Sequence, residues 1–435
     1  MKRLGRLLFA LALAACVIAC VIAVTPVFLG WFSERAAWLS GGDPKHPGSQ
    51  SDATGDVSAP AADWPMFHGD AALTGVTAAS IPDKPELLWT FKSGDQITGS
   101  ATIAGQRVFF GSADFKVYAL NLKDGAKLWE FKTEGAIEST PCVVGDVLFI
   151  GSGDQQLYAL DARTGALRWR YATEGEIKAG PNFVSGAALG LAPPPHPTLS
   201  PQGRGQDEGG RVLVGSYDNK LHCVDAATGK AAWTFETGNY VNGCAAIGAG
   251  KTVFGGCDAQ LHIVDVKTGE ETARVGVGAY VAASPALRDG IAYVGHYDSE
   301  LLAVDIQKAA VLWRFKNPHD FPFFSSPAVA QDRLVVGARD KRVHCLERAT
   351  GKELWSFSAR GKVDSSPAIA RDRVIAGSED GRVYILALQD GKELWSYDIG
   401  SSVDGSPAVS DGLFIVGADD GVLYAFGDKK SVGGR

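Results

Sequence analysis

Tryptophan recurs along this chain at a nearly constant step. Seven of its ten tryptophans form the series, which we call the tryptophan ladder: Trp89, Trp129, Trp169, Trp233, Trp313, Trp355 and Trp395. The successive steps are 40, 40, 64, 80, 42 and 40 residues. A repeat of about 40 residues is the length of one four-stranded β-propeller blade. Because blades bury their surfaces against one another, the ladder predicts one closed ring, although 435 residues would otherwise suggest two or three domains.

The irregular steps of the ladder have separate explanations. The step of 80 residues spans two repeats, and Ala273 occupies the position of the missing tryptophan. The step of 64 residues contains an insertion, residues 185–211, which is rich in proline and glycine. We predict that this insertion is disordered, and we assign it no function. The step of 42 residues has its two extra residues in the loop that runs from Asn317 to Phe324.

Each repeat reads as four short strands separated by turns, as in residues 97–133. The turn between the third and fourth strands carries Thr-Gly or Asp-Gly in most repeats and fails at Lys308-Ala309. The turn between the second and third strands always carries an aspartate. We interpret these aspartates as turn residues that bind their own backbone, rather than as a ring of metal ligands. They are Asp114, Asp154, Asp218, Asp258, Asp298, Asp340, Asp380 and Asp420.

The ends of the repeat region complement each other. After Trp395 the chain supplies three more strands, and before the first full repeat it supplies a lone fourth strand at residues 86–92. We therefore predict that this N-terminal strand completes the last blade and leaves no open sheet edge. The predicted fold is all-β: an eight-bladed propeller of four-stranded antiparallel blades, preceded by an N-terminal transmembrane helix.

The N-terminal region indicates export and attachment to a membrane. A basic flank at residues 1–6 precedes residues 7–32, an uncharged stretch long enough to span a bilayer as an anchor or signal segment. Alternatively, Leu13-Ala14-Ala15-Cys16 resembles a bacterial lipoprotein box, and Cys16 is then lipidated. Residues 33–62 have the composition of a flexible linker. The propeller is predicted at residues 63–428, and residues 429–435 form a tail.

Charge and cysteine content narrow the function. A net charge of −7 argues against nucleic-acid binding, which needs concentrated lysine and arginine. The chain has seven cysteines without a Cys-x-x-Cys pair, so we expect buried free thiols in the propeller; a pairing of Cys244 with Cys257 is the alternative. Histidines 222, 262 and 344 occupy a position held by tyrosine in other repeats, which predicts packing rather than metal binding.

The repeated unit resembles a known family. Its Tyr-Ala-Leu followed by Gly-x-x-Leu-Trp or a close variant, as in residues 117–129 and 157–169, is similar to the PQQ-like (quinoprotein-type) propeller repeat. Residues 64–75 also resemble the opening motif of that superfamily. The resemblance covers residues 64–427 and implies that the ladder tryptophans dock neighbouring blades. It is specific for the fold and says little about activity.

The resemblance implies two classes of function. Quinoprotein dehydrogenases bind PQQ and calcium at the channel mouth, but this chain lacks their adjacent cysteines, their large loop insertions and a Cys-x-x-Cys-His haem motif. The other class is similar to the propeller subunit of the outer-membrane β-barrel assembly machinery. We therefore predict a monomeric, membrane-tethered periplasmic scaffold for envelope proteins, with no catalytic residue, metal or cofactor. A PQQ- and calcium-dependent dehydrogenase and a module that recognises polysaccharide or peptide are the alternatives.

One face of the predicted ring is rich in aromatic and basic side chains. The connections between blades and the turns between second and third strands share this face. Aromatic residues and arginine are enriched in protein interfaces. The alternative is that the rings pack between blades. The candidate partner-binding residues are Tyr217, Tyr240, Tyr280, His296, Tyr297, His319, Phe321, Phe324 and Arg339.

Overall fold

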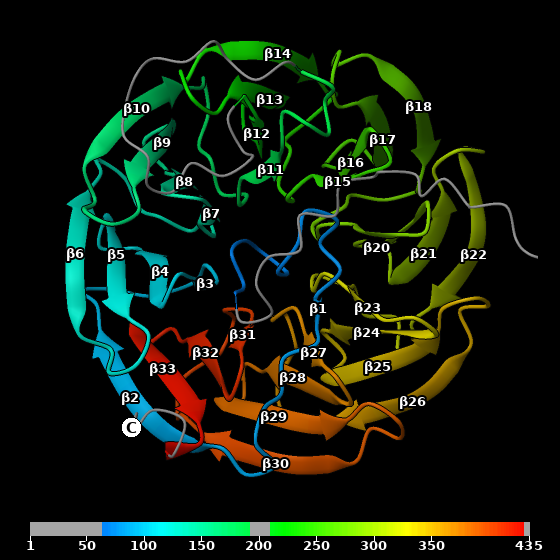
Figure 1. Cartoon of the computed structure of the whole chain (residues 1–435). Coiled ribbons are helices and arrows are strands. Elements are labelled where there is room, and N and C mark those ends of the chain that lie inside the picture. The colour runs from blue at the N-terminus through cyan, green and yellow to red at the C-terminus, as the bar shows by residue number, and fades with distance from the viewer. Residues whose placement is uncertain (1–62, 192–208, 430–435) are drawn as a thin grey trace, which may run out of the picture. The chain divides into compact units, whose positions relative to one another are not determined.

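A computed structural model of the chain describes residues 63–191 and 209–429, which form a ring of eight four-stranded blades (Figure 1); one further strand, β1, extends the sheet of blade 7. Within each blade the strands are antiparallel, and in blades 1 to 7 they follow chain order from the channel outwards (Figure 1). Blades 1–4 are β3 (Thr102–Ala104), β4 (Arg107–Ser112), β5 (Lys116–Asn121), β6 (Lys127–Lys132); β7 (Cys142–Val144), β8 (Val147–Gly151), β9 (Gln156–Asp161), β10 (Leu167–Ala172); β11 (Asn182–Val184), β12 (Arg211–Gly215), β13 (Lys220–Asp225), β14 (Ala231–Glu236); and β15 (Ala246–Gly248), β16 (Lys251–Gly255), β17 (Gln260–Asp265), β18 (Glu271–Gly276).

Blades 5–8 repeat this arrangement, and the last blade takes its outer strand from the N-terminal side of the chain. They are β19 (Ala286–Arg288), β20 (Ile291–Gly295), β21 (Glu300–Asp305), β22 (Ala310–Lys316); β23 (Ala328–Val329), β24 (Arg333–Ala338), β25 (Arg342–Glu347), β26 (Glu353–Ser358); β27 (Ala368–Ala370), β28 (Arg373–Gly377), β29 (Arg382–Ala387), β30 (Glu393–Asp398); and β31 (Ala408–Ser410), β32 (Leu413–Gly417), β33 (Val422–Gly427), β2 (Glu86–Lys92).

The predicted closure of the ring is confirmed. Strand β2 pairs antiparallel with β33, in a register that sets Glu86 opposite Gly427 and Lys92 opposite Val422. The first and last repeats of the chain are therefore joined within one sheet. With this pairing, blade 8 has four strands, as every other blade does.

The tryptophan ladder lies between blades. In six of its seven members the indole Nε1 donates a hydrogen bond of 3.0–3.2 Å to a backbone carbonyl of the next blade. The same indole covers a glycine in that blade's turn between third and fourth strands, where a Cβ atom would lie 2.4–2.7 Å from the ring. Tryptophan and glycine therefore form one unit. The pairs are Trp89–Gly125, Trp129–Gly165, Trp169–Gly229, Trp233–Gly269, Trp313–Gly351 and Trp355–Gly391.

The two irregularities of the repeat meet at a single junction. Blade 4 carries Ala273 where the other blades carry tryptophan, and blade 5 carries Ala309 where six other blades carry the turn glycine. Ala273 pairs with Ile263 in the register in which Trp129 pairs with Ala119. Both alanines pack against the same core cluster. The junction of blades 4 and 5 therefore lacks both the indole ring and the glycine that this ring would cover.

A belt of hydroxyl groups surrounds the channel. The backbone N–H of Ser284 donates to the hydroxyl of Ser326 in the next blade at 2.9 Å, and equivalent bonds join other neighbouring blades. The bond from the N–H of Ser406 in blade 8 to the hydroxyl of Ser100 in blade 1, at 3.1 Å, joins the last blade to the first, whereas Gly180 and Cys244 hold the equivalent places in blades 3 and 4 and carry no hydroxyl. The bonds of the belt are Ser100→Thr140, Cys244→Ser284, Ser284→Ser326, Ser326→Ser366, Ser366→Ser406 and Ser406→Ser100.

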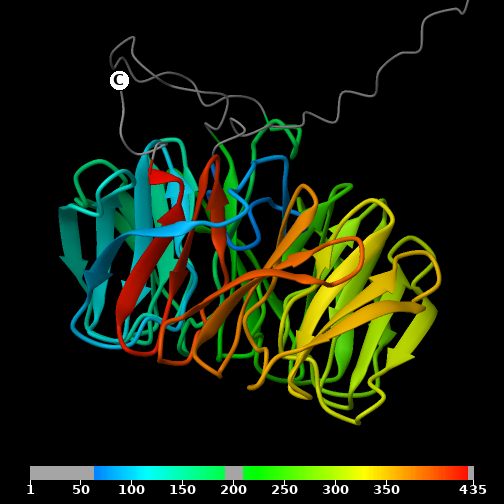
Figure 2. The same cartoon turned by 90° about the horizontal axis from the view of Figure 1, so that it is seen from below.

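A segment ahead of the first blade, residues 64–80, closes one end of the channel, and we call it the plug. Figure 1 shows the plug in blue at the centre of the ring, and Figure 2, a side view of the ring, shows it near the upper face. It touches the blades in chain order, mostly through backbone bonds to the inner strands, and its strand β1 (Val76–Thr77) pairs with β27. The bonded residues of blades 1 to 8 are Ile103, Val143, Asn182, Ile247, Leu287, Val329, Ile369 and Gly412.

Several predicted segments lie outside the described residues. These are the basic flank, the membrane segment at 7–32 with Cys16, the linker to residue 62 and the tail from residue 430. Within 63–191 and 209–429, no helix is long and apolar enough to cross a membrane. The predicted disorder of the insertion stays a prediction for residues 192–208. Its flank at residues 185–191 is ordered, because Leu189 is buried against the core of blades 3 and 4.

Candidate interaction face at the channel mouth

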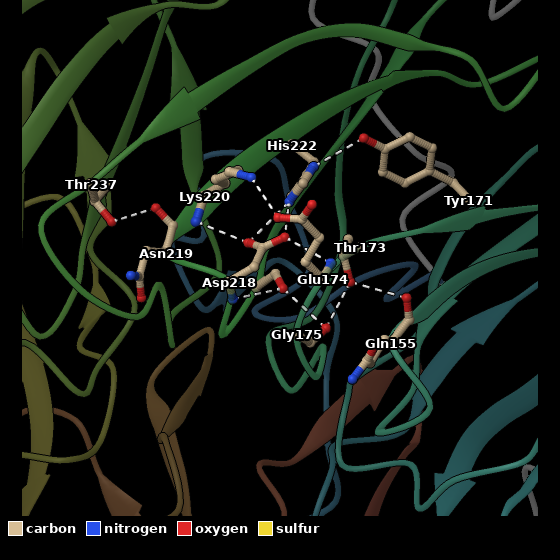
Figure 3. Close-up of polar contacts among 11 residues, drawn as sticks. Gln155, Tyr171, Thr173, Glu174, Gly175, Asp218, Asn219, Lys220, His222 and Thr237 are labelled. Carbon is tan, nitrogen blue, oxygen red and sulfur yellow. Dashed lines mark hydrogen bonds and ion pairs between the residues drawn. The ribbon is translucent and has the colours of Figure 1, made fainter.

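Seven of the eight repeated aspartates accept a hydrogen bond from their own turn, as the sequence indicates, and several also join blades; Asp298 differs, with its side chain 76% exposed. Asp218 accepts hydrogen bonds from its own turn at Lys220 N and from Glu174 N in the preceding connection (Figure 3). The ring four residues later completes the unit, because His222 Nε2 lies 2.9 Å from Asp218 Oδ2 and His222 Nδ1 lies 3.0 Å from the Tyr171 hydroxyl. In the described ranges, no three or more histidine, cysteine, aspartate or glutamate side chains form a group that could hold a metal ion.

Two of the three histidines in this position lie between two carboxylates. His262 is 2.8 Å from both Asp258 and Glu271, and His344 is 3.0 Å from Asp340 and 2.8 Å from Glu353. Burial lowers the pKa of each imidazole, but the hydrogen bonds and charges of the two carboxylates outweigh it and leave the pKa raised. A hollow of about 600 Å³ lies beside His262. Both ring nitrogens of His262 are already bonded, so this hollow offers no free imidazole to a ligand.

The other end of the channel from the plug carries the face that the sequence indicated. In each blade, the residue before the repeated aspartate donates its N–H to a carbonyl in the preceding connection; Tyr297 N, for example, lies 3.0 Å from Tyr280 O. Connections and second-to-third turns therefore share one face, which we call the mouth face. Its inner ring, one residue per blade, is Thr98, Glu138, Lys178, Asn242, Ala282, Phe324, Asp364 and Asp404.

The inner ring surrounds a cavity of about 190 Å³. Every member except Asp364 lines it, together with small and hydroxyl-bearing residues of the belt. Phe67 of the plug also lines this cavity. The space is thus a mostly polar, blind recess. Its single lysine, Lys178, is engaged by Glu138 at 2.9 Å and by Glu176 at 3.6 Å.

An unbroken row of rings crosses blades 4 to 6 of the mouth face. Tyr280 meets Tyr297 with ring centroids 6.3 Å apart, and Tyr297 meets Phe324 edge to face at 4.6 Å. We call these three residues the aromatic shelf. The Arg339 guanidinium lies 3.6 Å from the Phe324 centroid and is held by a two-nitrogen contact to Asp364. Tyr280 and Tyr297 remain 53% and 46% exposed, so the shelf is rigid at one end and open at the other.

A second ring pair lies beside the shelf. Tyr217 and Tyr240 stack with centroids 4.8 Å apart and planes 8° apart, and Lys178 Nζ lies 5.5 Å from the Tyr217 centroid. Tyr240 is 45% exposed. Half-buried Cys257 accepts a 3.2 Å hydrogen bond from Asn242. It is a free thiol like the four buried cysteines of the described propeller, so Cys244 and Cys257 are not paired.

Beyond Asp364 the mouth face becomes acidic. We call Glu379, Asp404 and Asp419 the carboxylate sector. Lys362 pairs with Glu379 at 3.1 Å, and Asp404 accepts a 2.9 Å hydrogen bond from the Ser402 hydroxyl. Burial raises the pKa of Asp404 and of Asp419, and neighbouring carboxylates raise it further. One oxygen of Asp419 is buried without a hydrogen-bond partner.

The carboxylate sector is not among the predicted site residues, although the repeat contains a signal for it. Asp404 occupies the same place in its blade as Phe324, and Asp419 the same place as Tyr297. Aligning the blades therefore identifies both. Aromatic residues in exposed loops distinguish blades 3 to 6, whereas single acidic residues in blades 7 and 8 resemble ordinary surface positions.

One predicted member of the face is wrong. His296 is only 1% exposed, and its Nδ1 accepts a 3.1 Å hydrogen bond from Asp298 N inside the turn. It takes the position that serine holds in several other blades, so its ring points into the protein. His319 and Phe321 lie in the connection to blade 6: His319 contacts Asp340 at 3.0 Å, and Phe321 is 46% exposed.

Comparison with known proteins gives a family. The sequence matches the family described as outer membrane protein assembly factor BamB over residues 75–192, 240–328 and 317–429. It matches none of the curated proteins with which it was compared. Among solved structures, BamB from Moraxella catarrhalis is 20% identical, with a TM-score of 0.63 over 79% of this chain and 98% of that one.

Other solved structures share the fold. The quinohemoprotein alcohol dehydrogenase of Comamonas testosteroni is 12% identical, with a TM-score of 0.68 over 86% of this chain and 81% of that one. The computationally designed protein Ika8 is 18% identical, with a TM-score of 0.65 over 79% of this chain and 100% of that one. At these identities the likeness shows the propeller fold alone.

Proposed function

The chain belongs to the family of the outer membrane protein assembly factor BamB, and on that premise we propose that it is a non-catalytic scaffold that binds envelope proteins through its mouth face. In this proposal the N-terminal segment, as an anchor or through lipidated Cys16, tethers the propeller to a membrane in the periplasm. The observation that carries the proposal is the row of exposed rings in blades 4 to 6, because rigid aromatic side chains supply contact area at little entropic cost.

The dehydrogenase alternative fits the described residues poorly. PQQ is a flat tricarboxylate and needs cationic groups around it, with calcium ligands beside it. Two carboxylates, Glu138 and Asp404, line the recess at the mouth, and its lysine is already paired with Glu138 and Glu176. No group of acidic, histidine or cysteine side chains suited to a metal occurs in residues 63–191 and 209–429. Reconstitution with PQQ and calcium, followed by a dye-reduction assay on alcohols, tests this alternative directly.

The scaffold proposal is tested by crosslinking the full chain in envelope membranes. We expect the variant Tyr240→Ala/Tyr280→Ala/Phe321→Ala to lose its crosslinked partner while keeping the thermal midpoint, since all three side chains are about half exposed. A matched control removes three apolar side chains of similar exposure from outer strands, Leu128→Ala/Leu354→Ala/Leu394→Ala. A large fall in the thermal midpoint of the mouth variant, or equal loss of the partner by the control, would contradict the proposal.

Attachment to a membrane needs a separate test. Mass spectrometry of the mature N-terminus distinguishes the two proposed tethers. An intact Met1 supports the anchor, and a chain that begins at a lipid-modified Cys16 supports lipidation. A mature chain that begins after residue 32 would rule out both.

A further inference from the structure

The mouth face has two adjoining parts of different chemistry. The aromatic shelf lies in blades 4 to 6, and the carboxylate sector lies in blades 7 and 8. Arg339 and Asp364 connect them, because the guanidinium covers Phe324 and grips Asp364 at 2.7 Å. Phe324 and Asp404 also line the same recess. A bound segment that lies on the shelf therefore reaches the carboxylates without a gap.

The carboxylate sector has an excess of negative charge. Arg339 neutralises Asp364, and Lys362 pairs with Glu379, which leaves Asp404 and Asp419 without an ion-pair partner among the described residues. These two carboxylates are partly desolvated and repel each other and their acidic neighbours. A cation placed between them would relieve this repulsion and would satisfy the free oxygen of Asp419.

Resting on the proposed function, we infer that the partner presents an extended protein segment in which lysine or arginine alternates with aromatic or other apolar residues. The apolar side chains lie on Tyr280 and Tyr297, and the cationic side chain enters the carboxylate sector at Asp404 and Asp419. A protein segment is favoured over a neutral polysaccharide, because sugar hydroxyls would not neutralise the two carboxylates. Acidic glycans and anionic lipid surfaces are repelled by the same charges.

The test uses the full chain and two dye-labelled hexapeptides, measured by fluorescence anisotropy. One peptide alternates arginine with tryptophan and tyrosine, and the other has glutamate in place of each arginine. We expect the cationic peptide to bind more tightly, and its binding to weaken with added salt. Asp404→Asn/Asp419→Asn should reduce its affinity about tenfold, and Tyr280→Ala/Tyr297→Ala should reduce it to a similar extent.

Matched controls are available on the other side of the ring. Asp124→Asn/Asp390→Asn removes the same two charges from turns between third and fourth strands, where asparagine can still accept the backbone hydrogen bond. This control should bind the cationic peptide as the unaltered chain does. Equal binding of the two peptides, or equal effects of the two aspartate double variants, would overturn the inference. Tighter binding of a neutral glucan oligosaccharide, unchanged by Asp404→Asn/Asp419→Asn, would overturn it in favour of a polysaccharide.

The outcomes also separate this inference from the proposed function. If neither peptide binds but the Tyr240/Tyr280/Phe321 variant still loses its crosslinked envelope partner, the inferred chemistry is wrong and the scaffold proposal stands. If that variant keeps its partner, the mouth face is not the docking surface and both proposals fail.

Discussion

The junction between blades 4 and 5 offers a direct test of how the ring is held together. It lacks both the tryptophan and the turn glycine that six other junctions share, at Ala273 and Ala309. The backbone register at Ala273 matches that of the tryptophan positions, so an indole placed there is aimed at the next blade. We predict that Ala273→Trp and Ala309→Gly are each neutral or destabilising alone and stabilising together.

The size of the effect follows from the other junctions. A tryptophan buries about 150–250 Å². Half of that, at about 25 cal/mol per Å², contributes about 2–3 kcal/mol. A hydrogen bond from Nε1 to a backbone carbonyl adds about 1 kcal/mol, which offsets the loss of side-chain freedom. With Ala309 unchanged, its Cβ would clash with the ring, since such an atom would lie 2.4–2.7 Å away at the other junctions. The expected coupling between the two changes is at least about 2 kcal/mol.

A double-mutant cycle measures this coupling. The four proteins are compared by urea midpoint and by thermal midpoint, because a propeller of this size need not unfold in a single step. Ala309→Gly alone should be nearly neutral, since it relieves a positive φ of 50° but adds freedom to the unfolded chain. If Ala273→Trp changes stability equally with and without Ala309→Gly, the tryptophan and glycine are not a unit and the reasoning is wrong.

Four further predictions concern stability. The pKa values of His262 and His344 are raised above 6.5 in the folded protein, so the stability that their protonated rings contribute is complete below that pH and is lost as the pH rises through the folded pKa. The variant H262Y/H344Y lacks this contribution. Between about pH 6 and pH 9 its thermal midpoint should therefore fall less than that of the unaltered chain. His222 has a lowered pKa, so H222Y should instead reduce the loss of stability as the pH falls below 6.5, and an identical pH profile for both variants would contradict the assignment. Asn182→Ala should lower the free energy of unfolding by about 1–3 kcal/mol in urea, because its buried side-chain amide holds carbonyls of both the plug and blade 4. Deleting residues 86–92 should leave β33 as an open edge and give aggregates in size-exclusion chromatography, whereas a soluble monomer would count against the closure.

The repeat made the ring predictable from sequence. The turn aspartates, the turn glycines and the ladder tryptophans recur at nearly constant spacing. Each of these residue types suits one local geometry of the blade, so its recurrence identifies that geometry in the sequence. The lone strand at residues 86–92 could be assigned to the last blade because the count of strands was incomplete at both ends. The sequence did not indicate that the missing tryptophan and the missing glycine face each other, because the two positions lie 36 residues apart and in different blades.

The plug and the carboxylate sector were less predictable for a different reason. The plug is held mainly by backbone bonds to each inner strand, and such bonds leave almost no trace in residue type. The carboxylate sector depends on residues from two blades and on the burial that only assembly produces. The prediction for His296 is wrong because neighbouring residues of this turn point alternately to the mouth face and into the protein. Residue type alone does not show which of them is buried.

Departures from the repeat also determine how a partner can lie on the ring. At the position before the repeated aspartate, blades 1 and 2 carry Ala113 and Gly153, whereas blades 5 to 8 carry an aromatic ring, an arginine and two carboxylates. The eight equivalent places thus hold seven residue types, with tyrosine at two of them. A symmetric ring would bind a segment equally in any of eight orientations. Here rings lie on one side of Arg339 and free carboxylates on the other, so a segment with apolar and cationic residues gains both contacts in only one orientation. The same asymmetry makes the mouth face suitable for holding a partner at a fixed angle, which is what a scaffold must do.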